Sequence, residues 1–133
     1  MRPTAITIPW ADGAYTFDLR LKEVRSLQDK TGFGCGVLLS RLQSDHWKVD
    51  DFRETILQGL IGGGMEPIPA AALVRQYVDD RPAKESLLPA AAILMAWIMG
   101  APPGKNQTPT IDDEAATVPV ASTSESSMEP ERR

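Results

Sequence analysis

The feature that most restricts the fold of this chain is a change of composition near residue 100. Residues 101–133 contain five prolines and eight serines or threonines, and no aromatic residue. Such a segment cannot bury enough apolar surface to offset about 1–2 kcal/mol of backbone entropy per residue. We therefore expect residues 1–100 to form the folded domain. Residues 101–133 are expected to be a disordered tail, acidic because six carboxylates face three basic side chains.

The charges and the rare residues of the chain exclude several classes of protein. Residues 1–100 carry 11 basic and 12 acidic side chains, so they lack the basic excess of a nucleic-acid-binding surface. Cys35 is the only cysteine and His46 the only histidine, which excludes an internal disulfide and Cys-rich or His-rich metal sites. Without a paired acid–base site, we expect no enzyme activity, no catalytic residue, no cofactor and no metal.

Two observations argue against a membrane protein. The N-terminus has no long apolar stretch of the kind found in signal peptides. Residues 87–99 are free of charge, but thirteen residues make a helix of about 20 Å, against about 30 Å of bilayer hydrocarbon. The expected location is the cytoplasm, with no membrane partner.

Alternation with a period of two predicts a β-hairpin within residues 1–20. Ile6 and Ile8 flank a threonine, and Tyr15 and Phe17 flank another. The intervening Ala11-Asp12-Gly13 contains an Asp-Gly pair, a common signal for a tight turn.

Helical spacing replaces this pattern over residues 21–100, which predicts a mainly α fold with a compact bundle of about five short helices. Each predicted helix has one apolar stripe. The five stripes are Leu21, Val24 and Leu27; Cys35, Leu38, Leu39 and Leu42; Phe52, Ile56, Leu57, Leu60 and Ile61; Ala70, Leu73, Val74, Tyr77 and Val78; and Ala90, Ile93, Leu94, Trp97 and Ile98.

Punctuating residues predict where these helices begin and end. Gly32 is the expected end of the first helix, and Pro82 follows the fourth. Asp51 is the expected N-cap of the third helix, and Glu54, three residues later, is its expected capping-box partner. Pro89 is best tolerated in a first turn, so the fifth helix is expected to begin near residue 87.

The most conspicuous local motif is the glycine run Gly62, Gly63 and Gly64. A phosphate-binding loop needs a strand before its glycines and a helix directly after them. Here a helix precedes the run, and Pro67 and Pro69 separate it from the next helix. We interpret the run as a structural turn, in which at least one glycine has a positive φ and another tolerates alanine.

The remaining polar candidates favour ordinary structural roles. Cys35 shares a stripe with three leucines and is expected in the core. The acidic residues around His46, namely Asp45, Asp50 and Asp51, fit a solvated loop and a helix cap better than a metal cluster. Asp79 and Asp80, at the end of the fourth helix, are expected to be solvated, the alternative being an ion pair with a partner.

The fifth helix has a second apolar face. Leu88, Ala92, Met95 and Met99 recur at spacings of four, three and four, on the side opposite its core stripe. A helix that is apolar all round is either fully buried or presents a surface to a partner. In a domain of about 100 residues complete burial is difficult, so this face is the predicted site for a partner or for self-association.

Residues 47–64, with the glycine run at their end, resemble the gene transfer agent family of phage tail proteins. The resemblance spans about residues 5–100. Its other matching pieces are the N-terminal hairpin, residues 21–27, Gly36 with Leu39 and Leu42, the runs Leu73-Val74 and Tyr77-Val78-Asp79, Pro82 and the apolar last helix. Members are similar to tail assembly chaperones encoded near the tape measure protein. Some descriptions of the family use the name tail tube protein instead.

The resemblance implies a cytoplasmic assembly chaperone that binds the tape measure protein during tail morphogenesis, alone or with other tail assembly proteins or as a homo-oligomer. The alternative is a structural tail tube component of the particle. Tube subunits are rich in β-structure because stacked rings join through sheets and hairpins. One hairpin and five helices therefore favour the chaperone.

Overall fold

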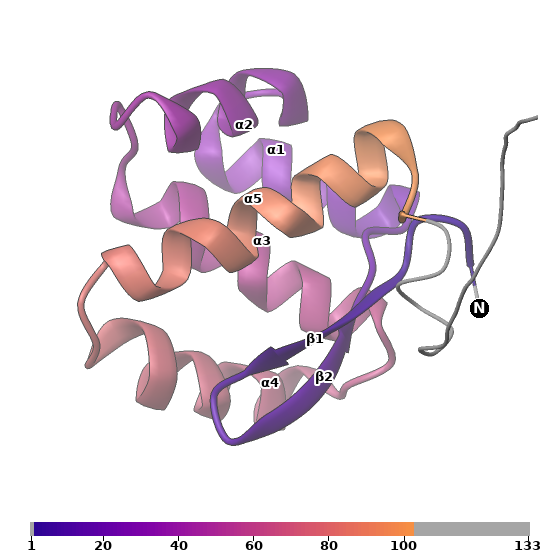
Figure 1. Cartoon of the computed structure of the whole chain (residues 1–133), viewed down its shortest axis with the longest axis vertical. Coiled ribbons are helices and arrows are strands. Elements are labelled where there is room, and N and C mark those ends of the chain that lie inside the picture. Colours follow the sequence, from indigo (N-terminus) through magenta and orange to yellow (C-terminus); the bar gives the residue numbers. More distant parts are fainter. Residues whose placement is uncertain (1, 103–133) are drawn as a thin grey trace, which may run out of the picture. The chain divides into compact units, whose positions relative to one another are not determined.

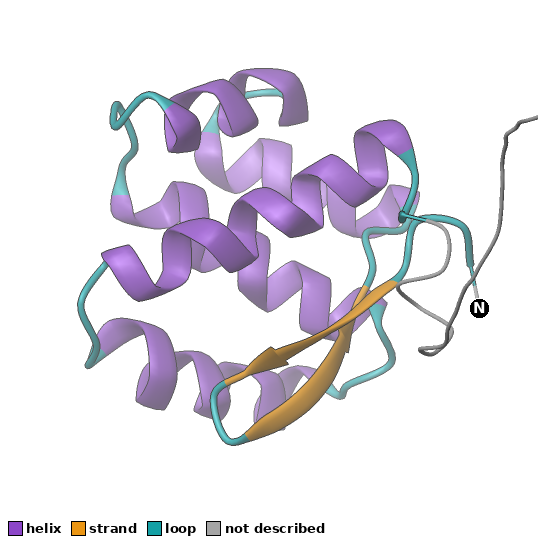
Figure 2. Ribbon diagram, in the orientation of Figure 1, coloured by secondary structure: helices purple, strands orange, loops and turns teal. Residues whose placement is uncertain are grey.

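The structure is a computed structural model that describes residues 2–102. A two-stranded hairpin is followed by five α-helices and one π-helical turn, which confirms the predicted mainly α fold (Figure 2). The predicted disordered tail lies, apart from its first two residues, outside the described part. The elements are β1 (Ile6–Trp10), β2 (Gly13–Phe17), α1 (Leu21–Thr31), α2 (Cys35–Gln43), α3 (Val49–Gly62), α4 (Pro67–Val74), η1 (Arg75–Asp79) and α5 (Lys84–Met99).

The hairpin pairs β1 with β2 in an antiparallel register that sets Ile6 opposite Phe17 and Trp10 opposite Gly13. Gly13 therefore begins β2, and the loop consists of Ala11 and Asp12 alone. The turn therefore lies within the predicted segment, and Ala11 takes the left-handed backbone there, with a φ of 57°. Trp10 holds the hairpin on the helices through edge-on ring contacts with Phe17 on β2 and Tyr77 on η1.

Helices α1 and α2 follow the predicted stripes closely. Gly32 ends α1 with a φ of 82°, and its amide donates to the Gln28 carbonyl at 2.8 Å. On α2, Leu38 is fully buried, and Leu39 is partly buried against the core. Leu21 departs from the prediction, because it begins α1 and is exposed.

Helix α3 is the central element and packs against α1, α4, α5 and β2. It begins three residues earlier than expected, with Lys48 as N-cap, so the prediction of Asp51 as N-cap is wrong. Asp51 is the third residue of the helix, and its Oδ2 accepts from the Lys48 amide at 2.8 Å. An acidic residue at the third helical position can satisfy the backbone amide of the N-cap residue, as Asp51 does here. An acidic residue can also serve as the N-cap itself, so the sequence alone does not distinguish the two positions.

The fourth predicted helix is divided by a change of winding. Residues 67–74 form α4, and residues 75–79 form the π-helical turn η1. Ala70, Val74 and Val78 are buried along this segment, and Leu73 and Tyr77 are partly buried against the core. The predicted apolar stripe is therefore retained across the change.

Helix α5 begins at Lys84, three residues before the expected start, so Pro89 lies inside it. The turn after Pro82 starts the helix, because the Glu85 amide donates to the Pro82 carbonyl at 3.0 Å. Pro89 removes the helical hydrogen bond that the Glu85 carbonyl would accept. Figure 1 shows α5 on the near side of residues 2–102, with α3 behind it.

Candidate partner-binding surface

Helix α5 leaves the second apolar face largely exposed to solvent. Leu88 is 79% exposed, Met99 75% and Met95 41%, and Ala92 between them is partly buried. We call these four residues the outer face of α5. Exposed large apolar side chains on one stripe are unusual unless something covers them.

The opposite side of α5 belongs to the core, with one correction to the predicted stripe. Ala90, Ile93 and Leu94 are buried, and Trp97 is partly buried against the core. Ile98 is 44% exposed, so its assignment to the core is wrong. It lies about 40° beyond Leu94 around the helix, outside the arc that faces α2 and α3.

The charged side chains of α5 itself are confined to one end of the helix. Lys84 and Glu85 lie in the first turn, and Glu85 is paired with Arg81 at 2.9 Å. From residue 86 to residue 102 the described chain has no charged side chain. An apolar surface with charge only at one end can bind another apolar helix without desolvating an ion.

The glycine run lies where the end of α3 contacts the backbone at the end of β2, a contact that we call the seam. A Cβ on Gly62 would overlap the carbonyl oxygen of Asp18, and one on Gly63 would overlap that of Thr16. Gly64 has a φ of 115°, in the region that favours glycine. Each glycine therefore has its own reason to lack a side chain, and the expectation that one of them tolerates alanine is wrong.

Hydrogen bonds join the two sides of this seam. The Asp18 amide donates to the Gly59 carbonyl at 3.0 Å, and Arg20 Nε donates to the Gly62 carbonyl at 3.3 Å. The Gly59 carbonyl also accepts from the Gly63 amide at 2.9 Å, and Arg20 satisfies the Gly62 carbonyl at the end of α3, which the helix itself would leave without a partner. The geometry of the run is thus that of an internal backbone contact.

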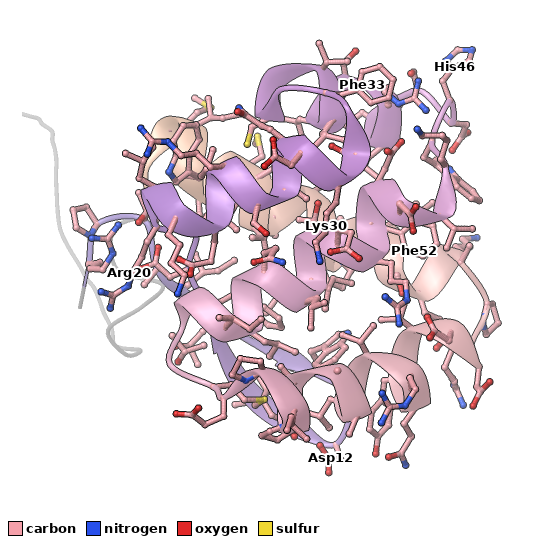
Figure 3. The ribbon with its side chains drawn as sticks, turned by 180° about the vertical axis from the view of Figure 1, so that it is seen from behind. Asp12, Arg20, Lys30, Phe33, His46 and Phe52 are labelled. Carbon is pink, nitrogen blue, oxygen red and sulfur yellow. The ribbon has the colours of Figure 1, made fainter. Side chains whose placement is uncertain are left out.

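The cysteine and the histidine lie in different settings. Cys35 is buried, and burial raises the pKa of its thiol, which keeps it in the weakly nucleophilic protonated form. His46 is exposed on the loop between α2 and α3, near the edge of the view in Figure 3, with its Nδ1 at 3.0 Å from Ser44 Oγ. Within residues 2–102, no cluster of three His, Cys, Asp or Glu side chains is arranged to hold a metal ion.

Ion pairs along α3 form a group that the sequence patterns did not reveal. Arg41 contacts the buried Asp51 at 2.9 Å, and Lys30 reaches from α1 toward Glu54 at 4.0 Å (Figure 3). Arg53 donates two hydrogen bonds to Asp79, at 2.8 and 3.1 Å. Asp79 is therefore paired within the chain, so the expectation of a solvated carboxylate is wrong for Asp79, whereas Asp80 is exposed as expected.

Comparison with known proteins agrees with the predicted resemblance. No curated protein and no solved structure matches the chain. None of the helices in residues 2–102 has the length and apolar character needed to cross a membrane. The family model described as phage tail tube protein, GTA-gp10, matches residues 4–100, which is most of the chain and all of its described elements. The chain therefore belongs to the GTA-gp10 family of phage tail proteins.

Proposed function

We propose that this protein is an assembly chaperone of a phage or gene-transfer-agent tail, and that the outer face of α5 binds an apolar helical segment of the tape measure protein. The observation that carries the proposal is the exposure of Leu88, Met95 and Met99 on one side of a helix whose opposite side is packed in the core. Methionine side chains adapt to partners of different shape, which suits a protein that holds a long client.

The size of this surface is sufficient for specific binding. Burying a leucine or methionine contributes about 1.5–3 kcal/mol before the entropic cost of association. Three such side chains on one stripe supply several kcal/mol when they act together. Two helices packed along such a stripe are a common mode of protein recognition.

A structural tail component is the alternative, and the description of the family as tail tube protein favours it. Against it stands the small amount of β-structure, since residues 2–102 contain one two-stranded sheet. Quantitative mass spectrometry of purified particles separates the two functions. A chaperone is absent from the particle or present in trace amounts, whereas stoichiometric amounts would contradict the chaperone and support the tail component.

The binding site is tested by co-expression with the tape measure protein of the same tail, followed by pull-down. Met95→Glu combined with Met99→Glu is expected to leave the circular dichroism spectrum unchanged and to abolish retention of the tape measure protein. Ile68→Glu is the matched control, because Ile68 is 83% exposed on α4, away from this stripe. Undiminished retention by the folded double variant would show that the tape measure protein binds elsewhere.

A further inference from the structure

We propose that two copies of this chain pair through the outer face of α5, antiparallel to each other and related by a two-fold axis. The observation behind this inference is that the exposed side of α5 is complementary to itself when its direction is reversed. The inference goes beyond the proposed function, because the pairing covers the outer face when no tail protein occupies it.

The exposed side of α5 extends the outer face by three residues. Positions four, seven or eleven residues apart lie within about 40° of one another around a helix of 3.6 residues per turn. Lys84, Ala91 and Ile98 therefore lie on the same side as the outer face. Lys84 is exposed like the larger apolar side chains, and Ala91 is partly buried like Ala92.

Reversal about the point between Ala91 and Ala92 maps this side of α5 onto itself. It exchanges Leu88 with Met95 and Lys84 with Met99. At the margin of the contact it also sets Ile98 opposite Glu85, whose carboxylate is already paired with Arg81. In an antiparallel pair, each exposed leucine therefore packs on a methionine of the other copy. The two alanines lie at the axis, where their short side chains let the helices approach closely. Such a contact uses the same patch twice and closes as a dimer.

The charge on α5 favours a second antiparallel helix over a parallel one. Lys84 lies in the first turn, where the helix dipole disfavours a cation, and the last turn contains no basic residue. Antiparallel pairing brings each Lys84 to the C-terminal end of the other α5, where the dipole favours a cation. Each copy thus supplies the basic group that the other copy lacks.

Sedimentation equilibrium on the full chain, without any tail protein, tests the pairing. The expected result is a mass that rises with concentration from 14.5 kDa toward twice that value. Met95→Glu is expected to weaken association by about tenfold or more, because each new carboxylate faces a leucine of the other copy. Ile68→Glu, with its equally exposed position on α4, is expected to leave association unchanged. A wild-type chain that stays monomeric at all concentrations would overturn the proposal.

Lys84→Glu tests the antiparallel orientation through two effects of opposite sign. An acidic residue in the first turn favours the dipole of its own helix, so the melting temperature of the dilute monomer is expected to rise slightly. The same carboxylate meets the C-terminal end of the other α5 in the dimer, so association is expected to weaken. Association that is unchanged or stronger would contradict the antiparallel arrangement.

Disulfide trapping gives an independent measure of the orientation. The native Cys35 is buried and does not compete for oxidation. A mixture of Leu88→Cys and Met95→Cys chains is expected to form a covalent dimer, whereas neither variant alone forms one. Efficient trapping of Leu88→Cys with itself would show a parallel pair and overturn the proposal. Because no tail protein is present, these results are independent of the pull-down that tests the chaperone function.

Discussion

At the scale of single residues, glycine has two opposite roles in this chain. Gly62 and Gly63 lie where α3 touches the backbone of β2, and any Cβ there meets a carbonyl oxygen. Gly36 lies in the first turn of α2, and a Cβ there meets no atom within 4 Å. The same substitution is therefore expected to have opposite effects at these sites.

Gly62→Ala and Gly63→Ala are each expected to lower the free energy of unfolding by about 1–3 kcal/mol, because backbone must move to admit the methyl group. Gly36→Ala is expected to raise it by about 0.5 kcal/mol, because alanine reduces the entropy of the unfolded chain and favours the helix. Urea unfolding of the three variants measures both effects. A Gly62→Ala chain as stable as the wild type would contradict the close contact of β2 with α3.

At the scale of elements, one ion pair connects the end of η1 to the middle of the central helix. Arg53 on α3 holds both carboxylate oxygens of Asp79, and this hydrogen bonding raises the pKa of the guanidinium. Both side chains are about one-third exposed or less. A bidentate pair of an arginine and a carboxylate fixes the relative orientation of the two side chains more strictly than a single hydrogen bond does.

Asp79→Asn is expected to lower the free energy of unfolding by about 0.5–1 kcal/mol, since a partly exposed pair is screened by solvent. The loss is expected to shrink at high salt, where the pair contributes less in the wild type. Asp80→Asn serves as the control, because Asp80 is exposed and no ion pair to it is seen within residues 2–102. Equal stability of the two variants in low salt would show that the pair does not stabilise the junction of η1 with α3.

At the scale of the whole described region, its two ends are joined next to the hairpin. Arg2 and Thr4 both donate to the buried carboxylate of Asp18. One residue after Arg2, the Pro3 carbonyl accepts from the Ala101 amide at 2.8 Å. The first residues, the end of β2 and the segment after α5 are therefore connected through a few polar contacts.

Arg2→Met is expected to destabilise the protein by about 1–3 kcal/mol, because it leaves the Asp18 carboxylate buried without its cation. Hydrogen exchange at the Ala101 amide is expected to accelerate in the same variant. Combining Arg2→Met with Asp18→Asn measures the coupling, and losses that simply add would contradict a direct interaction.

The sequence by itself determined the features that depend on neighbouring residues. Alternation around Thr7 and Thr16 was sufficient for the hairpin, and Gly32 for the end of α1, because strand period and left-handed caps are local properties. The uncharged run in residues 87–99 likewise contained the outer face of α5 as well as its core stripe. These patterns also carried the resemblance to the phage tail family.

Tertiary structure decided the features in which distant segments meet. Ile98 belongs to the apolar pattern of α5, yet it is exposed because α2 and α3 cover only part of that helix. Asp79 is paired because α3 brings Arg53 beside it from 26 residues away in the sequence. Gly62 and Gly63 are adjacent at the end of a helix, but the reason for both lies in the distant backbone of Thr16 and Asp18, at the end of β2 and just after it. Periodicity describes which side of a helix is apolar, whereas only packing determines how much of that side another element covers.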